Sequence, residues 1–223
     1  MTPTLLAEPT QRPPARAPEP RARAAALSAI AEPDCSIAIW QRPVDAVVER
    51  QAAHLAASEH LAIRLHLTPE QIAAGVAAPL TAQCAALSAM GEWLADMQRL
   101  AHDFASLARR LAGQNAITLR LETVSDDGCR RFHVDRVQLR LLCTYLGPGT
   151  EWLTEAQVDR EALAAHQPNE RIQRWGSPQR LAPFWVGVLK GEVYPGQAGR
   201  GQVHRSPPLA RSDGTRVLFC MDV

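Results

Sequence analysis

The sequence has few aromatic residues, no Cys-x-x-Cys pair and no long apolar run. Its five cysteines are odd in number and widely spread, which disfavours a disulfide framework or a zinc ribbon and favours a reducing cytoplasm. No stretch approaches the roughly 18 consecutive apolar residues of a membrane helix, and the N-terminus shows no signal-peptide core. We therefore expect a cytoplasmic protein with no membrane partner.

The chain also lacks an excess of charge of either sign. Its 24 Lys and Arg residues and 23 Asp and Glu residues give a net charge of +1, and no basic face is apparent. Binding to a phosphate backbone needs such a face, so nucleic acid is not an expected partner. With 223 residues, 46% of them hydrophobic, the chain is long enough for one domain with a substantial core.

The composition changes along the chain. Residues 1–31 are crowded with Pro, Ala and Arg, and such a segment cannot bury enough surface to offset its ordering entropy. We therefore predict a disordered tail followed by a single domain over residues 32–223. Apolar residues recur with helical spacing in residues 43–113, whereas short alternating runs separated by Gly, Pro and Asp are typical of strands in residues 115–223. The pattern predicts an α+β protein.

Three elements of the first half are predicted individually. CSIAIW, residues 35–40, and LAIRLHL, residues 61–67, read as short strands. From about Pro79 to Gly113, apolar residues at intervals of three and four predict one long helix with a single apolar face. A new helix is also expected at Thr68, where the threonine is followed by a first-turn proline.

Candidate metal ligands occur in the second half. In RRFHVDRVQLRLLCTYLG, His133 and Asp135 share one face of a predicted strand, because alternate strand residues point the same way. In GRGQVHRSPP, His204 provides a second imidazole. Two imidazoles and a carboxylate on one side of an ion form the facial triad of non-haem Fe(II) oxygenases. Taken alone, the His-x-Asp pair is equally typical of a capped strand end.

Arg216 begins the last predicted strand. A Ser-Asp-Gly turn precedes it and would return the chain beside the segment of His204. A guanidinium beside a metal can hold a carboxylate through two charge-assisted hydrogen bonds. Such a grip is what binding 2-oxoglutarate requires. Arg140, Arg205 and Arg211 are alternative candidates for this role.

The order and rough spacing of four residues resemble those of the Fe(II)/2-oxoglutarate-dependent dioxygenases, in particular the prolyl-hydroxylase-like members: His133, Asp135, His204 and Arg216. The resemblance covers residues 130–223. It implies a double-stranded β-helix, a cupin-like jelly roll, built mainly from residues 115–223 and buttressed by the preceding helices. It also implies that Tyr145 shares the carboxylate of 2-oxoglutarate with Arg216. The implied activity is the oxidation of a small-molecule or protein substrate that the sequence does not specify.

A second resemblance covers nearly all of the chain after the tail. The segments CRRFHVDRV, RLLCTYLGPGTEWL and HRSPP resemble a bacterial family of unknown function, number 1826, whose members often occur beside genes for zinc-responsive metallochaperone GTPases. This resemblance implies a functional link to such a GTPase. It also keeps open a non-catalytic Zn(II)-binding protein of metal homeostasis, which would use the same His/Asp/His site and could recruit Cys129. A relative that retains only the fold is a third interpretation.

Overall fold

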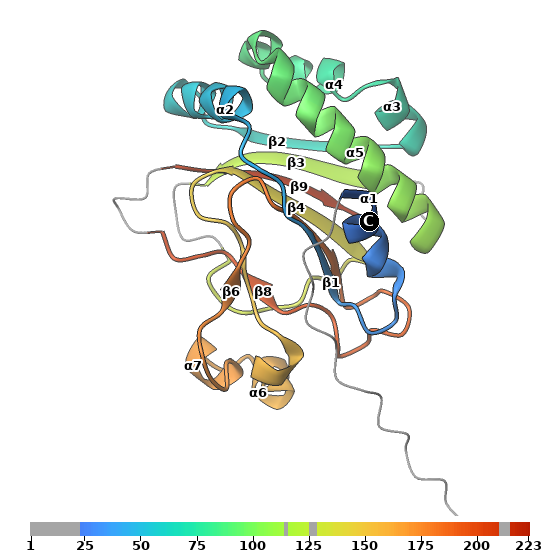
Figure 1. The fold of residues 1–223 in the computed structure, drawn as a ribbon, viewed down its shortest axis with the longest axis vertical. Helices are drawn as coiled ribbons and strands as arrows, with labels where there is room; N and C mark the ends of the chain where they lie inside the picture. Colours follow the sequence, from blue (N-terminus) through green and yellow to red (C-terminus); the bar gives the residue numbers. More distant parts are fainter. Residues whose placement is uncertain (1–22, 114–115, 125–128, 210–214) are drawn as a thin grey trace, which may run out of the picture.

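The computed structural model describes residues 23–113, 116–124, 129–209 and 215–223. Helices gather over one face of a six-stranded antiparallel sheet, and a smaller three-stranded sheet lies on the other side with two short helices below it (Figure 1). The predicted α+β fold is therefore confirmed, with antiparallel sheets. Within the described ranges, no helix combines the length and the apolar character needed to cross a membrane.

The main sheet combines strands from both halves of the chain. Its strand order is β1 (Ile37–Trp40), β7 (Val186–Lys190), β4 (Leu139–Leu146), β9 (Arg216–Asp222), β3 (Ile117–Val124) and β2 (Ala62–Leu67). All neighbouring strands are antiparallel. The two short strands predicted in the first half thus form the edges of the sheet, so the sheet is not confined to residues 115–223.

The two faces of the main sheet meet different partners. In β4, Cys143 and Tyr145 belong to the large core beneath the helices, whereas Leu142 belongs to a smaller apolar cluster facing the second sheet. In β9, Phe219 lies on the helix side and Leu218 on the other side. Because successive strand residues point to opposite faces, neighbours in sequence enter separate environments. This alternation decides which side chains can meet at a site.

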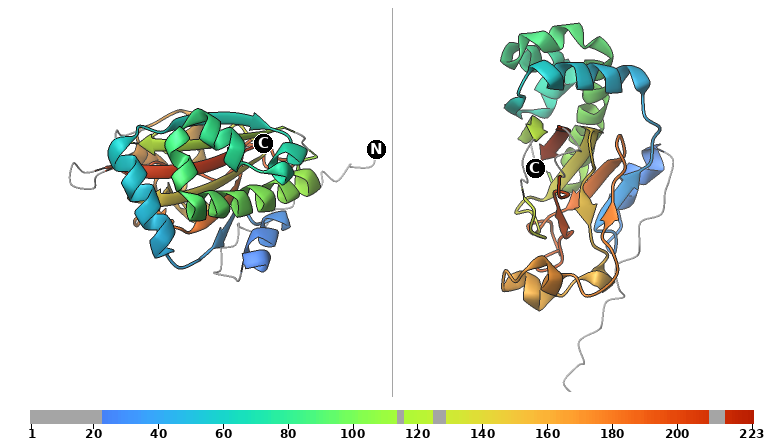
Figure 2. Two further views of the ribbon diagram at one scale, coloured as in Figure 1. Left: turned by 90° about the horizontal axis from the view of Figure 1, so that it is seen from above. Right: turned by 90° about the vertical axis from the view of Figure 1, so that its left-hand side faces the viewer.

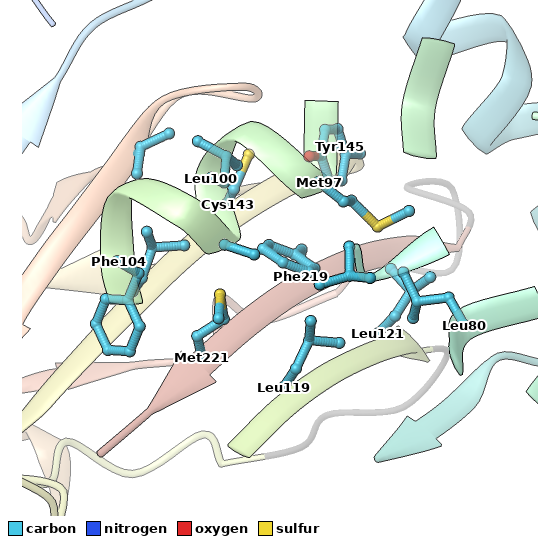
Figure 3. Packing of buried hydrophobic residues seen from close by; sticks show 14 of the residues in the cluster. Leu80, Met97, Leu100, Phe104, Leu119, Leu121, Cys143, Tyr145, Phe219 and Met221 are labelled. Carbon is cyan, nitrogen blue, oxygen red and sulfur yellow. The ribbon is translucent and has the colours of Figure 1, made fainter. Parts of the chain in front are cut away.

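Four helices cover one face of the main sheet: α2 (Ala46–Ser58), α3 (Pro69–Ala74), α4 (Ala77–Gln83) and α5 (Gly91–Leu111) (Figure 2). The apolar face of α5 presents Met97, Leu100 and Phe104 to strand residues such as Phe219 and Met221 (Figure 3). Helical spacing of three and four places these side chains on one stripe, and the stripe packs within the protein's own core.

The helix predicted at Thr68 begins as expected. The Thr68 hydroxyl accepts a hydrogen bond from the Gln71 N–H at 3.3 Å, and the Gln71 side chain accepts one from the Thr68 N–H at 2.8 Å. This reciprocal pair is a capping box, which satisfies two N–H groups that a helix start leaves free. Pro69 occupies the first helical turn, where a missing N–H costs nothing.

The prediction of one continuous helix from about Pro79 to Gly113 is wrong. Helix α4 ends at Gln83, a 3-10 segment η2 (Ala85–Ala89) follows, and α5 begins at Gly91. The breaks fall at Cys84 and Met90, whose backbone angles are not helical. Apolar spacing alone does not reveal such breaks, because buried residues can reach one core from three separate segments.

The predicted disordered tail is too long. Residues 23–31 form a short helix α1 (Arg23–Ser28) and a 3-10 turn η1 (Ala29–Ala31), and Leu27 and Ile30 are buried in the main core. These two side chains lie about one helical turn apart, so even a short alanine-rich helix can bury both. The rest of the predicted tail, residues 1–22, lies outside the described residues.

The second sheet pairs β6 (Gln179–Arg180), β5 (Glu151–Trp152) and β8 (His204–Arg205), and between β5 and β6 run η3 (Glu155–Gln157), α6 (Arg160–Ala164) and α7 (Asn169–Ile172). A backbone bridge between His133 and His204 adds a fourth chain segment beside β8. Leu142, Trp152 and Leu218 are among the apolar side chains packed between the two sheets. The space that the sheets flank is where the predicted ligands lie.

Candidate metal centre

The backbone brings His133 and His204 side by side. The N–H of each residue donates to the carbonyl of the other at 3.0 Å, and their ring centroids lie 4.6 Å apart. Asp135 lies next to both rings, with its Oδ1 3.6 Å from Nε2 of His133 and its Oδ2 3.1 Å from Nε2 of His204. One potential ligand atom from each residue lies within 4.8 Å of the others. The structure therefore brings the three predicted ligands together.

Backbone carbonyls set the orientation of both imidazoles. Nδ1 of His133 lies 2.8 Å from the carbonyl oxygen of Arg131, and Nδ1 of His204 lies 3.1 Å from that of Gln202. A carbonyl oxygen only accepts hydrogen bonds, so each Nδ1 carries the proton, and in the neutral ring each Nε2 keeps a free lone pair. Metal-binding histidines have this arrangement, in which the other ring nitrogen donates to a fixed acceptor.

The carboxylate of Asp135 has an oxygen without a partner. Oδ2 is buried and accepts no hydrogen bond within the described part of the chain, although Nε2 of His204 lies close to it. Burial alone would raise the pKa of Asp135. The contacts with His133 and His204 lower this pKa by more than burial raises it, so the carboxylate stays charged. A cation among the three residues would meet the free oxygen and both nitrogen lone pairs. The donor set suits Fe(II), Zn(II) and related ions.

Protons compete with a metal for these residues. Burial lowers the pKa of His133, whereas the contacts with Asp135 and with the carbonyl of Arg131 raise it, and the net result is a raised value. Its side chain is 32% exposed, compared with 6% for His204. Of the two candidate histidine ligands, His133 is thus the one nearer to solvent.

Arg216 is a buried cation surrounded by hydroxyl groups. It is 1% exposed, and its Nη2 donates to Oγ1 of Thr150 at 2.9 Å and of Thr144 at 3.4 Å. Nη1 reaches Oγ of Ser206 at 3.4 Å, and Nε has no acceptor among the residues that the structure describes. Burial lowers the pKa of Arg216 to about 10, which leaves it charged at neutral pH. Glu122 lines the same cavity as Arg216 and raises its pKa against the effect of burial, but no carboxylate in the described ranges forms an ion pair with this guanidinium. An anion in the cavity would supply the missing partner.

His133, His204 and Arg216 line the same cavity. Its volume is about 160 Å³, and its walls include His133, His204, Arg216 and Thr150. A small ligand inside this cavity would have both imidazoles and the guanidinium of Arg216 among its neighbours. Cys129 also lines the cavity but does not belong to the cluster of metal-ligating atoms. Cys129 is therefore not one of the candidate ligands that the structure brings together.

Tyr145 lies on the opposite side of β4. Tyr145 lies in the core beside Met97 of α5 (Figure 3). Its hydroxyl donates to Oδ2 of Asp96 at 2.7 Å, and its ring packs edge-on against Trp93 and Phe184. The structure therefore contradicts the predicted role of Tyr145 beside Arg216. The reason is strand alternation: the preceding residue, Thr144, points to the cavity side.

The three hydroxyl partners of Arg216 found in the described residues were missed by sequence reasoning: Thr144, Thr150 and Ser206. Strand alternation places Leu142 and Thr144 on the face opposite Tyr145, but β4 is buried on both faces and its sequence does not mark which face meets the cavity. Thr150 gave no comparable signal, since it follows an irregular turn. A Cβ at Gly149 would lie 1.9 Å from the carbonyl oxygen of Leu181, so glycine is needed for the close approach that carries Thr150 to Arg216.

The competing arginines have other partners. Nη1 of Arg140 lies 2.5 Å from Oδ1 of Asp135, and Nε of Arg205 donates to Glu151 at 2.8 Å. Arg211 lies outside the described residues. Among the arginines whose placement is described and that line the cavity, Arg216 is the one that lacks an acidic partner.

The chain belongs to the family described as "Protein of unknown function (DUF1826)", whose model matches residues 21–222. This confirms the predicted membership. No curated protein matches the sequence.

Solved structures whose chains align with this one include several oxygenases. A dioxygenase for auxin oxidation from rice is 17% identical over 84% of this chain and 72% of its own, with a TM-score of 0.46. A putative oxygenase from Shewanella oneidensis is 13% identical over 89% and 84%, with a TM-score of 0.45. A putative 2OG-Fe(II) oxygenase family protein from Caulobacter crescentus is 13% identical over 84% and 77%, with a TM-score of 0.43. These likenesses are distant, and the interpretation of the site rests on its own geometry.

Proposed function

We propose that this member of the family binds Fe(II) and 2-oxoglutarate and uses them to oxidise a further substrate. The observation that carries the proposal is that the two histidines of the His/Asp/His cluster line the same cavity as Arg216. A module that only binds metal needs the three ligands, and it gives no role to the buried Arg216, which has no acidic ion-pair partner among the described residues. A dicarboxylate held by the metal at one end and by Arg216 at the other accounts for both features.

We further propose that the two sheets form a double-stranded β-helix. The support is that the sheets flank an apolar cluster and that the segment of His133 extends the smaller sheet to four chain segments. Strands β1 and β2 are then additions at the edges of the larger sheet. The proposed metal position lies where His133 and His204 pair, at the side of the smaller sheet.

The three candidate ligands, Arg216 and two leucines each have a defined part in this proposal. His133, Asp135 and His204 would hold the iron, and the guanidinium of Arg216 would bind the far carboxylate. Leu142 and Leu218 line the cavity and suit the methylene groups between the two ends of 2-oxoglutarate. When bound, the iron supplies dioxygen activation coupled to the decarboxylation of 2-oxoglutarate. The protein supplies geometry, charge and exclusion of water.

The alternative is a Zn(II)-binding protein that uses the same three ligands. Such a site binds Zn(II) more tightly than Fe(II) when both ions are supplied. A structural zinc site, however, has four protein ligands, and the cluster found in the described residues contains three. The link to a metallochaperone GTPase and the cytoplasmic location both stay predictions.

Two ligands that differ only at the far end test the role of Arg216. 2-Oxoglutarate and 2-oxovalerate share the 2-oxo acid group, but a methyl group replaces the far carboxylate in 2-oxovalerate. We expect the Co(II)-loaded protein to bind 2-oxoglutarate roughly 10- to 100-fold more tightly, because hydrogen bonds to a charged group contribute about 1.5–3 kcal/mol. Calorimetric titration of both ligands measures this preference, which should disappear in Arg216→Ala.

Arg180→Ala is the matched control. Arg180 pairs with Glu151 and does not line the cavity, so this variant should keep the preference. Equal affinity of the wild-type protein for the two ligands would contradict the proposal. A preference that survives in Arg216→Ala would remove the arginine from the cosubstrate site.

A further inference from the structure

The side chain of Asp135 needs an anchor that the backbone does not provide. Asp135 lies between the bridge at His133 and the start of β4, outside any strand. Its carbonyl oxygen accepts the N–H of Glu192 at 2.8 Å, which fixes the main chain but leaves the carboxylate free to rotate. The contact that restricts the carboxylate is with Arg140, whose Nη1 lies 2.5 Å from Oδ1.

Arg140 is itself held rigidly by the main sheet. Its Nε donates to Oδ1 of Asp222 at 2.5 Å and its Nη2 to Oδ2 at 3.1 Å. Arg140 and Asp222 are direct partners on β4 and β9. Asp222 also accepts a hydrogen bond from Nη2 of Arg120 at 3.2 Å. The side chains of Arg140 and Asp222 are only 15% and 11% exposed, so this row of alternating charges is largely shielded from water.

We infer that Arg140 is a positioning residue that makes Asp135 a one-oxygen metal ligand, an inference that rests on the proposed metal centre. Arg140 contacts Oδ1, while Oδ2 is buried, accepts no hydrogen bond from the described part of the chain and lies 3.1 Å from Nε2 of His204. The metal therefore meets Oδ2 alone. If both oxygens were free, the carboxylate could chelate the ion and fill a position that the cosubstrate needs. The guanidinium thus sets both the direction and the number of the carboxylate ligands.

Loss of such an outer partner typically weakens metal binding 10- to 100-fold. We expect Arg140→Ala to lower Co(II) affinity by roughly this factor and to change the visible absorption of the bound ion. Arg140→Lys should fall between, because an ammonium can reach one oxygen but cannot grip Asp222 and Asp135 together. Millimolar methylguanidinium should restore affinity in Arg140→Ala, whereas a merely structural defect would not respond. Arg180→Ala should match the wild-type protein.

The experiment is a Co(II) titration of each full-length variant, with thermal melting as a check of folding. Wild-type affinity and a wild-type spectrum in Arg140→Ala would overturn the inference and leave the metal centre intact. Another result would also overturn the inference: weakened Co(II) binding in Arg140→Ala that methylguanidinium does not restore, with equally weak binding in Arg140→Lys. Arg140 would then have only a structural role. If Arg140→Ala does not fold, the Co(II) affinities and spectra of Arg140→Gln and Arg140→Lys test the inference by the same criteria. Failure of the wild-type protein to bind Co(II) would instead remove the proposed function and this inference together.

Discussion

His204→Ala should bind Fe(II) or Co(II) more than 100-fold more weakly than the wild-type protein. Changes to residues that merely orient metal ligands weaken binding by roughly 10- to 100-fold, so removal of a ligand should exceed that range. The variant loses the Nε2 that lies 3.1 Å from Asp135, and two ligands cannot hold the ion on one face. A competition titration against a chelating dye measures the affinity.

His66→Ala is the control for this experiment. His66 is an exposed histidine of β2 that contacts Thr118, so its removal tests for binding by surface histidines. This variant should bind the metal as tightly as the wild-type protein. Undiminished stoichiometric binding by folded His204→Ala would show that the ion does not sit in the cluster.

Asp96→Ala should lower the free energy of unfolding by about 3–5 kcal/mol. Asp96 is 3% exposed and accepts hydrogen bonds from both terminal nitrogens of Arg42, at 2.7 and 2.8 Å, and from Tyr145. Burial raises the pKa of Asp96, but the hydrogen bonds and charge of Arg42 outweigh it and lower the value. Without the carboxylate, the buried charge of Arg42 has no counterion. The loss is large beside a typical total stability of about 5–15 kcal/mol.

Urea unfolding of Asp96→Ala and Arg99→Ala provides the comparison. Arg99 also pairs with Asp96, at 3.0 Å, but its side chain is 52% exposed, and exposed pairs contribute only about 0–1 kcal/mol. We therefore expect Arg99→Ala to be nearly as stable as the wild-type protein. Equal stability of the two variants would show that the buried network contributes no more than a surface ion pair.

The candidate ligands could be predicted because metal chemistry restricts the residue types. A His-x-Asp step, a distal histidine and a following arginine are few enough in this chain to be recognised in order. What the sequence could not supply was the bridge between His133 and His204, because pairing between distant segments depends on the whole sheet. Arg140 illustrates the same limit, since its partners Asp135 and Asp222 come from different parts of the fold.

The prediction that Tyr145 lies beside Arg216 failed because of the burial pattern of β4. The strand is central in the main sheet and is mostly buried on both faces, so its residues do not alternate between apolar and polar. A pattern of this kind predicts a strand but not which face each residue occupies. Asp96 on α5 favours the helix side of the sheet for Tyr145, because it offers the Tyr145 hydroxyl a buried acceptor.

The central proposal is that one cavity holds Fe(II) and 2-oxoglutarate together. An anaerobic titration of the Fe(II)-loaded protein with 2-oxoglutarate tests it directly, because chelation of iron by a 2-oxo acid produces a metal-to-ligand charge-transfer band in the visible range. We expect this band in the wild-type protein, and none in Asp135→Ala. Absence of the band at saturating 2-oxoglutarate, with Zn(II) binding that still depends on His133, Asp135 and His204, would contradict the oxygenase proposal and favour a zinc-binding protein.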